Sequence, residues 1–178
     1  MDALVKILRH EMPARFEARR ADEIRAAIAL AKEFHLRAVI EGGDEAGLLL
    51  DEIADAKIPV VLAPVRDVRE PEGWERTAAL AAELAKHKIP FAIGTGRGHF
   101  STMRLRAQVA MAIAGGLPRD AALAAVTSGA AAILGVDTEM GALAPGREAN
   151  IVLFDGDPFD PTTPVRMAMV DGDVLYQR

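Results

Sequence analysis

The stretch that decides the fold is RAVIEGGDEAGLLLDEIADAKIPVVLAP, residues 37–64. It predicts a strand at Arg37–Glu41, a glycine loop, a helix over Glu45–Ala56 and a second strand at Pro59–Pro64. The β-branched cores of these strands suit burial on both faces of a sheet, which is typical of parallel strands joined by helices. The stretch therefore predicts one βαβ unit with a right-handed crossover.

The same alternation continues on both sides of this unit. Further strands are expected at Ala14–Ala18 and Pro90–Thr95, and further helices at Ala21–Phe34 and Trp74–His87. The chain thus contains four strand-helix cycles and an α/β fold with a parallel sheet. Doubly wound sheets and (β/α)8 barrels are both built from such units, so the alternation alone leaves both open.

The remainder of the chain changes from helices to short strands. Three helices are expected first, and then an isolated strand and a hairpin whose Asp-Gly turn lies between apolar runs. The expected elements are helices at Met103–Ala114, Pro118–Val126 and Ser128–Leu134, strands at Ile151–Phe154, Arg166–Val170 and Val174–Gln177, and the turn Asp171–Gly172. We therefore divide the chain into a βα region with trailing helices, residues 1–135, and a small β module, residues 136–178.

Composition excludes several classes of protein. Hydrophobic residues make up 51% of the 178 residues, so intrinsic disorder is excluded. A net charge of −5 argues against nucleic-acid binding. Cysteine is absent, which excludes disulfides and thiol catalysis. We find no apolar run long enough for a signal peptide or a membrane span, and we expect a cytoplasmic protein without a membrane partner.

The C-terminal residues carry a family resemblance. The stretch GLPRDAALAAVTSGAAAILGVDTEMGALAPGREANIVLFDGDPFDPTTPVRMAMVDGDVLY, residues 116–176, resembles the end of the amidohydrolase superfamily and in particular its imidazolonepropionase-like members. The matching positions are Ala122–Leu123, Thr127–Ser128, Ala131, Leu134–Gly135, Gly141, Leu143, Pro145–Gly146, Ala149–Asn150, Asp157–Pro158 and Asp171–Gly172. Asn150 departs from the family, which usually has aspartate there.

The upstream residues are similar to the second half of the family's catalytic barrel. PARFEARRADEIRAAIALAKEF is similar to strand 5 and its helix, and AVIEGGDEA, IPVVLAP and IPFAIGTG are similar to strands 6, 7 and 8. The resemblance implies strands 5 to 8 of a TIM-type (β/α)8 barrel. It also implies metal-dependent hydrolysis of C–N bonds, in which zinc or a similar divalent ion lowers the pKa of a bound water to near 7. In the family, histidines hold the metal and an aspartate after strand 8 moves the proton.

Each family position that this chain covers has lost its functional side chain. Glu17 and Arg19 stand where the strand 5 motif has histidines, Gly42 replaces the strand 6 histidine, and Gly96 replaces the catalytic aspartate. Glycine has no ligating group, and a guanidinium stays protonated and repels a metal. The HxH pair and the strand 4 ligand of the family have no counterpart in these residues. We therefore expect no metal site, no cofactor and no catalytic residue, and leave open whether the chain is an enzyme.

Charged residues at the expected barrel mouth are candidates for ligand binding. They are Glu17, Arg19, Arg20, Glu41, Asp44, Arg97 and His99. One interpretation is a salt-bridge network that occupies the former metal site, and the alternative is a solvated charge cluster. The glycine-rich loop around Arg97 could bind an anion through its backbone N–H groups, or it is only the strand 8 loop of the family.

Four barrel strands alone leave two open sheet edges, which is a liability for a monomer. We therefore expect a homo-oligomer, or a partner chain that covers the open edges, and an open sheet buried against a partner is a third solution. Three functions remain open from the sequence. They are a non-catalytic amidohydrolase-like scaffold or subunit, a metal-dependent amide or cyclic-imide hydrolase completed in trans by a chain supplying the N-terminal half, and an anion-binding module at the barrel mouth.

Overall fold

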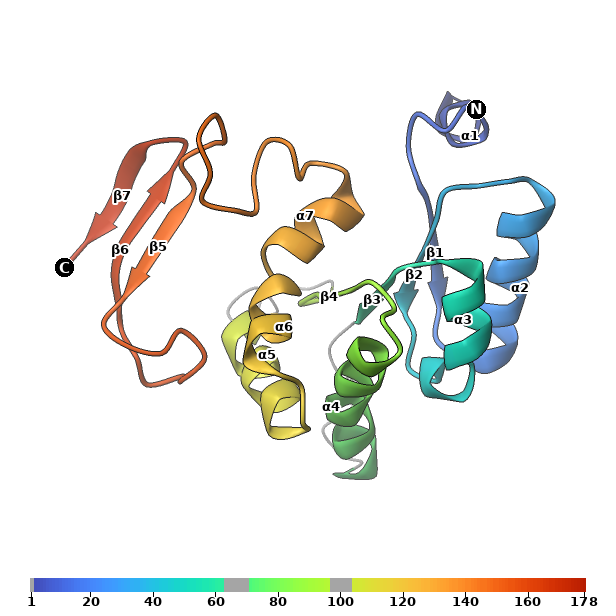
Figure 1. Ribbon diagram of the computed structural model, residues 1–178, viewed down its shortest axis with the longest axis horizontal. Coiled ribbons are helices and arrows are strands. Elements are labelled where there is room, and N and C mark those ends of the chain that lie inside the picture. The colour runs from blue at the N-terminus through green and yellow to red at the C-terminus, as the bar shows by residue number, and fades with distance from the viewer. Residues whose placement is uncertain (1, 63–70, 97–103) are drawn as a thin grey trace.

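The computed structural model describes residues 2–62, 71–96 and 104–178 and contains a four-stranded parallel sheet (Figure 1). Its strands are β1 (Ala14–Ala18), β2 (Ala38–Gly42), β3 (Val60–Leu62) and β4 (Phe91–Ile93). They lie side by side in chain order, β1-β2-β3-β4. A doubly wound sheet reverses its strand order at a switch point, whereas a barrel does not. The order therefore identifies a sector of a (β/α)8 barrel.

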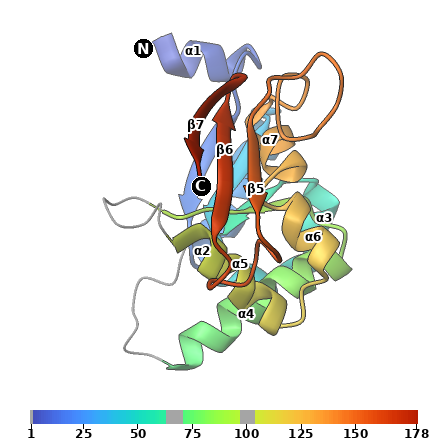
Figure 2. The ribbon, with the colours of Figure 1, turned by 90° about the vertical axis from the view of Figure 1, so that its left-hand side faces the viewer.

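Helices connect these strands and cover one face of the sheet (Figures 1 and 2). They are α2 (Ala21–Glu33), α3 (Leu50–Ala56) and α4 (Pro71–Lys86), and a short helix α1 (Asp2–Leu8) precedes β1. The single helix expected over Glu45–Ala56 is wrong. A 3₁₀-helix, η1 (Ala46–Leu48), comes first, and Leu49 then leaves helical geometry with φ −134° and ψ 23°. Leu49 is 2% exposed, so core packing at this residue overrides continuous helix propensity.

The main hydrophobic core lies between the sheet and its covering helices. Residues of the sheet's outer face pack against apolar side chains of α2, α3 and α4. This core includes Ala18, Ile40, Val60 and Leu62 from the strands and Ile24, Ile28, Ile53 and Leu84 from the helices. The alternate strand residues face the opposite, inner side, where Val39 and Ala92 pack with Ile133. The inner side is the side that faces the axis in a closed barrel.

The C-terminal part begins with the helices α5 (Leu105–Ala114), α6 (Arg119–Ala124) and α7 (Ser128–Leu134). A separate antiparallel sheet of β5 (Ile151–Phe154), β6 (Val165–Val170) and β7 (Asp173–Gln177) follows. The expected hairpin is confirmed, and its turn residues Asp171 and Gly172 have φ 50° and 87°. Asn150 Oδ1 accepts a 2.9 Å hydrogen bond from the Asp171 N–H. The amide that departs from the family pattern thus supports the turn.

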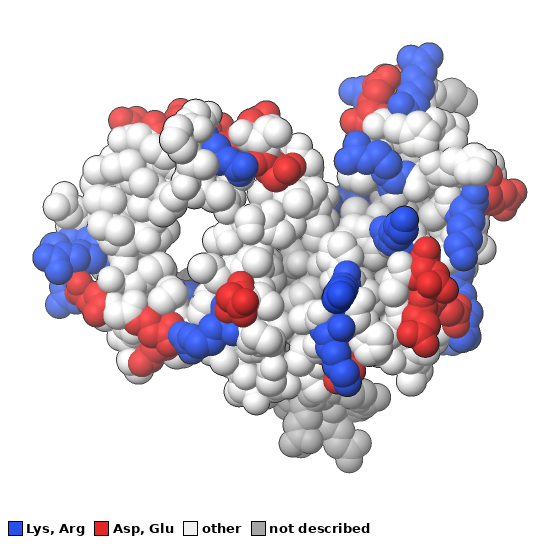
Figure 3. Space-filling view, viewed as in Figure 1, with Lys and Arg blue, Asp and Glu red and all other residues white. Residues whose placement is uncertain are grey.

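Few contacts join the second sheet to the helices, and the space-filling view shows an opening between them (Figure 3). Arg106 of α5 donates from Nε to the Pro158 carbonyl at 2.6 Å and from Nη2 to the Thr163 carbonyl at 2.9 Å. Phe159 is 9% exposed and belongs to the main core. Residues 154–163 therefore act as the docking segment of the second sheet. Within the described residues, no helix is long and apolar enough to cross a membrane.

Candidate functional site

The expected barrel mouth lies where β1 and β2 end. The two strands are parallel and in register, with Glu17 opposite Glu41 and Ala18 opposite Gly42. Arg19 follows β1 directly, and Asp44 is separated from Gly42, the last residue of β2, by Gly43 alone. Because the carboxyl ends of parallel strands meet at one edge of a sheet, the topology brings these residues together.

Arg19 is the centre of this site. Its Nη1 lies 3.1 Å from Asp44 Oδ2, and its Nε lies 3.7 Å from Glu17 Oε1. The Arg19 side chain is 26% exposed, whereas those of Glu17 and Asp44 are about half exposed at 54% and 47%. A single guanidinium therefore bridges two carboxylates from neighbouring strand ends. Glu17, Arg19 and Asp44 form the expected salt-bridge network.

Gly42 leaves the space that Arg19 fills. A Cβ atom at position 42 would lie 3.0 Å from Arg19 Cγ and 3.7 Å from Arg19 Cζ. Gly42 also has φ +101°, a backbone conformation that L residues rarely adopt. A side chain at this position, which resembles the place of the family's strand 6 histidine, would therefore be strained by the backbone and would require Arg19 to shift.

Two other predicted residues take different partners. The Glu41 carboxylate pairs with Arg15 across the β1–β2 register, and Arg20 pairs with Asp22 at 2.8 Å. The side chains of Arg20 and Asp22 are 68% and 66% exposed, so this ion pair lies in solvent. Sequence reasoning missed Arg15, although its place two residues before Glu17 puts both side chains on one strand face. The remaining candidates, Arg97 and His99, lie outside the described residues.

Glu23 and Glu45 fix the backbone that carries Arg19. Glu23 Oε2 accepts hydrogen bonds from the Arg19 N–H at 2.8 Å and the Arg20 N–H at 3.1 Å. Glu45 Oε2 accepts one from the Ala21 N–H at 2.8 Å. Sequence reasoning missed both residues. A glutamate at the third position of the helix was the available signal for Glu23, because that position reaches back to the N-cap N–H.

These bonds give the site a pH dependence. The backbone N–H groups of Arg19 and then Arg20 hold the pKa of Glu23 below its usual value of 4.5. Because this pKa is lower in the folded state, the stabilisation contributed by the ionised Glu23 carboxylate is complete above pH 4.5 and is lost as the pH falls through the folded pKa.

We expect Glu23→Gln to reduce the difference between the free energies of unfolding at pH 7 and pH 3, measured by urea unfolding at both pH values. Asp51→Asn, an exposed first-turn acid of α3, is the control; an unchanged pH dependence in Glu23→Gln would contradict the prediction.

The donor set does not fit a divalent metal. Within residues 2–62, 71–96 and 104–178, no group of three or more His, Cys, Asp or Glu side chains could hold a metal ion. Arg19 pairs with both Glu17 and Asp44, and its single positive charge offsets one of their two negative charges. A permanent positive charge at that place opposes a cation. The site is therefore an ion-pair network built around an arginine.

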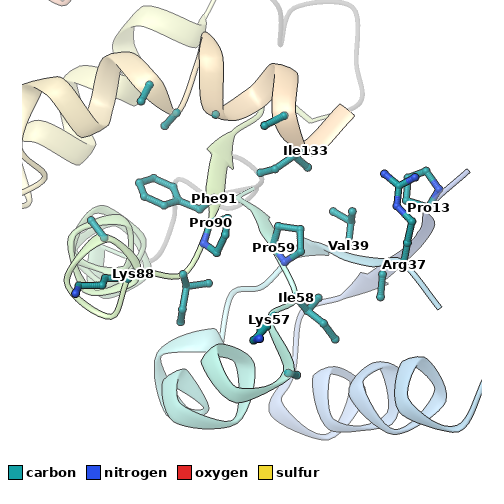
Figure 4. A pocket seen from close by; sticks show the side chains of 18 of the residues that line it. Pro13, Arg37, Val39, Lys57, Ile58, Pro59, Lys88, Pro90, Phe91 and Ile133 are labelled. Atoms are coloured by element: carbon teal, nitrogen blue, oxygen red, sulfur yellow. The ribbon is translucent and has the colours of Figure 1, made fainter. Parts of the chain in front are cut away.

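A second feature lies at the opposite ends of the strands. An apolar hollow of about 700 Å³ is lined by residues such as Pro13, Val39, Phe91 and Ile133 (Figure 4). Its proline residues immediately precede the strands, which places it at the amino ends of the sheet. The hollow and the Arg19 network are therefore separated by the length of the strands, and the hollow is not part of the candidate site.

Comparisons with known proteins agree with this fold. The amidohydrolase family model matches residues 98–176. An amidohydrolase from Thermotoga maritima MSB8 is 32% identical with a TM-score of 0.90, and the alignment covers 99% of this chain and 46% of that one. Together with the parallel sheet and the small antiparallel sheet, these matches show that the chain belongs to the amidohydrolase superfamily. No curated protein matches the chain.

More distant structures share the fold alone. Molinate hydrolase is 14% identical with a TM-score of 0.72, covering 98% of this chain and 45% of that one. A 5-methylcytosine deaminase from Klebsiella pneumoniae is 17% identical with a TM-score of 0.65, covering 92% of this chain and 47% of that one. The chain thus spans just under half the length of the structures it resembles.

Proposed function

We propose that this chain is a non-catalytic, amidohydrolase-like scaffold or subunit of a larger assembly. The observation that supports the proposal is the Arg19 network at the carboxyl ends of β1 and β2, where the family resemblance implies metal-binding histidines. Arg19 pairs with Glu17 and Asp44, and Gly42 supplies no ligating side chain and has a φ of +101°, which strains any side chain placed there. The metal-dependent hydrolysis of the superfamily needs a divalent metal ion, whereas this chain carries the positively charged Arg19 guanidinium among the corresponding residues.

Assembly is part of the same proposal. The chain aligns over 99% of its length with a structure of which it covers only 46%, so the matching fold continues beyond these residues in that relative. We infer that a second copy or a partner chain covers the open side of the sheet. We place the assembly in the cytoplasm, because the sequence has no cysteine and so does not depend on the oxidising compartments in which disulfides form.

A hydrolase completed in trans is the second candidate. The coverage of 46% favours it, because a chain that supplied the remaining strands would also supply their metal ligands. The substrate class would then be an amide or a cyclic imide. Arg19 is an obstacle to this candidate, since its guanidinium would have to leave before a metal could bind near Glu17.

Metal analysis tests the first proposal directly. The purified chain is dialysed with zinc, freed of unbound ion and assayed for bound metal and for hydrolysis of amide and cyclic-imide substrates. We expect well below one zinc per chain and no turnover. Stoichiometric zinc together with turnover by the isolated chain would contradict the proposal, and zinc uptake only after mixing with a chain that carries the N-terminal half would favour completion in trans.

A further inference from the structure

The hollow at the amino ends of the strands is walled by this chain on two sides. The turns that precede β2, β3 and β4 line one side, and α6 and α7 line the other (Figure 4). On the inner face of the sheet, Val39 and Ala92 are only 2% and 4% exposed because Ile133 of α7 packs on them. Of the described residues that line the hollow, Pro13 alone comes from the turn before β1. The hollow is therefore formed by this chain's own elements, whatever lies beside β1.

The charged side chains that line this hollow are all basic. Arg37 precedes β2, Lys57 precedes β3 and Lys88 precedes β4, and all three residues are exposed. No aspartate or glutamate of the described residues lines the hollow. Because the whole chain has a net charge of −5, three cations around one hollow reverse the overall charge of the protein.

These three cations have no counter-ion of their own. Within residues 2–62, 71–96 and 104–178, their side chains form no ion pair and no hydrogen bond. Arginines elsewhere in the chain do pair with carboxylates, as Arg25 does with Glu52 and Arg119 with Asp157. Positive charges that line one hollow repel each other, and an anion bound among them would offset that repulsion.

Two of the cations lie in a backbone conformation that lysine rarely adopts. Lys57 follows α3 with φ 55°, and Lys88 lies beyond the end of α4 with φ 56°. Glycine or asparagine is the usual residue at such a helix end. The helix dipole favours a cation there, but α4 already has Lys86 in its last turn. Retention of lysine at a strained position therefore points to a role for its charge beyond the end of the helix.

We propose that this hollow binds an amphipathic organic anion, whose carboxylate or phosphate head is held by Arg37, Lys57 and Lys88. The aliphatic part of the ligand lies on the apolar floor, to which Pro59 and Phe91 contribute. The volume of about 700 Å³ falls within the range of roughly 300–1,000 Å³ that is typical of small-molecule sites. Such sites combine an apolar lining with a few convergent polar groups, as this hollow does. The inference goes beyond the proposed function and does not involve the lost metal chemistry.

Titration calorimetry with the purified chain tests the chemistry of the ligand. Decanoate and decyl phosphate, used below the concentrations at which they form micelles, are the two probes, and the tighter of them identifies the preferred head group. We expect one of them to bind at one site per chain and at least about tenfold more tightly than its six-carbon analogue, because each buried methylene adds to the affinity. Decyltrimethylammonium has the same chain with a cationic head and is expected not to bind. Equal binding of this cation would overturn the proposal.

Neutralising the lysines tests the part played by the charges. Lys57→Asn/Lys88→Asn removes two of the three cations and is expected to weaken binding of the anionic probe at least about tenfold. Asparagine tolerates the left-handed backbone at both positions, so the variant is expected to fold, as checked by circular dichroism. Lys86→Gln is the matched control, because Lys86 pairs with Glu83 at 3.8 Å and does not line the hollow. Unchanged affinity in the double variant would overturn the proposal, and so would an equal loss in the control.

Filling the hollow tests where the aliphatic chain lies. Ala132 of α7 lines the hollow and is exposed, so Ala132→Phe can place its ring there without displacing buried atoms. We expect this variant to weaken decanoate binding at least about tenfold, whereas Leu134→Phe, at an exposed position of α7 outside the hollow, is expected to leave it unchanged. Unchanged binding in Ala132→Phe, or binding only to vesicles that contain anionic lipid, would overturn the proposal. These titrations use no zinc, so their failure would leave the test of the non-catalytic function unaffected.

Discussion

Arg106→Ala is expected to lower the free energy of unfolding by about 3 kcal/mol, because one guanidinium holds the docking segment of the second sheet. Arg106 donates to the backbone carbonyls of Pro158, Asp160 and Thr163 and lies 4.9 Å from the centroid of the Phe154 ring. A hydrogen bond from a charged donor contributes about 1.5–3 kcal/mol, and a cation–π contact about 0.5–2 kcal/mol. The sum overstates the loss, since carbonyls of this half-exposed segment regain water.

The measurement is urea unfolding followed by circular dichroism, together with limited proteolysis of residues 154–163. Arg106→Lys keeps the charge but loses the planar fork, so it is expected to recover less than half of the lost stability. Arg166→Ala is the matched control, because that arginine forms an exposed ion pair with Asp155 at 3.3 Å and should change stability by less than about 1 kcal/mol. Equal effects of Arg106→Ala and Arg166→Ala would contradict the structural role of Arg106.

Local signals in the sequence were sufficient for much of the fold. The alternation of strands and helices correctly predicted four parallel strands, because the apolar strand cores are separated by helices of the required length. Their order along the sheet was implied only by the resemblance to barrel strands 5 to 8. The Asp171–Gly172 turn correctly predicted the β6–β7 hairpin, since both residues tolerate positive φ. The break at Leu49 could not be predicted, because it depends on which side chains the tertiary core accepts.

Sequence order indicated which charged residues gather at the ends of β1 and β2, but not how they pair. Sequence order placed Glu17, Arg19 and Asp44 near the carboxyl ends of neighbouring strands, and ion pairs join them in the structure. That Glu41 would pair with Arg15 depends on strand register, which a list of charged residues does not contain. The bonds from Glu23 and Glu45 to backbone N–H groups depend on loop geometry, and the sequence shows only that acids stand near the start of α2.

Gly42→His, which returns the family's strand 6 ligand, is expected to fail as a zinc site and to destabilise the fold. A side chain at position 42 requires the strained φ of +101° and contacts Arg19 at 3.0 Å. Backbone strain of this kind costs about 1–3 kcal/mol. The guanidinium of Arg19 would in addition repel zinc and keep Glu17 and Asp44 engaged.

Removing the arginine together with restoring the histidine should change this outcome. In Arg19→Ala/Gly42→His, a neutral imidazole and the released carboxylates of Glu17 and Asp44 supply three of the donors that zinc prefers. We expect this double variant to bind zinc at least about tenfold more tightly than Gly42→His, measured by titration with a competing chelator. Arg19→Ala/Gly42→Ala is the matched control, because it has the same strain and the same freed carboxylates without the imidazole. If Gly42→His alone bound zinc as tightly as the double variant, Arg19 would not be what excludes the metal, and the non-catalytic assignment would lose its main support.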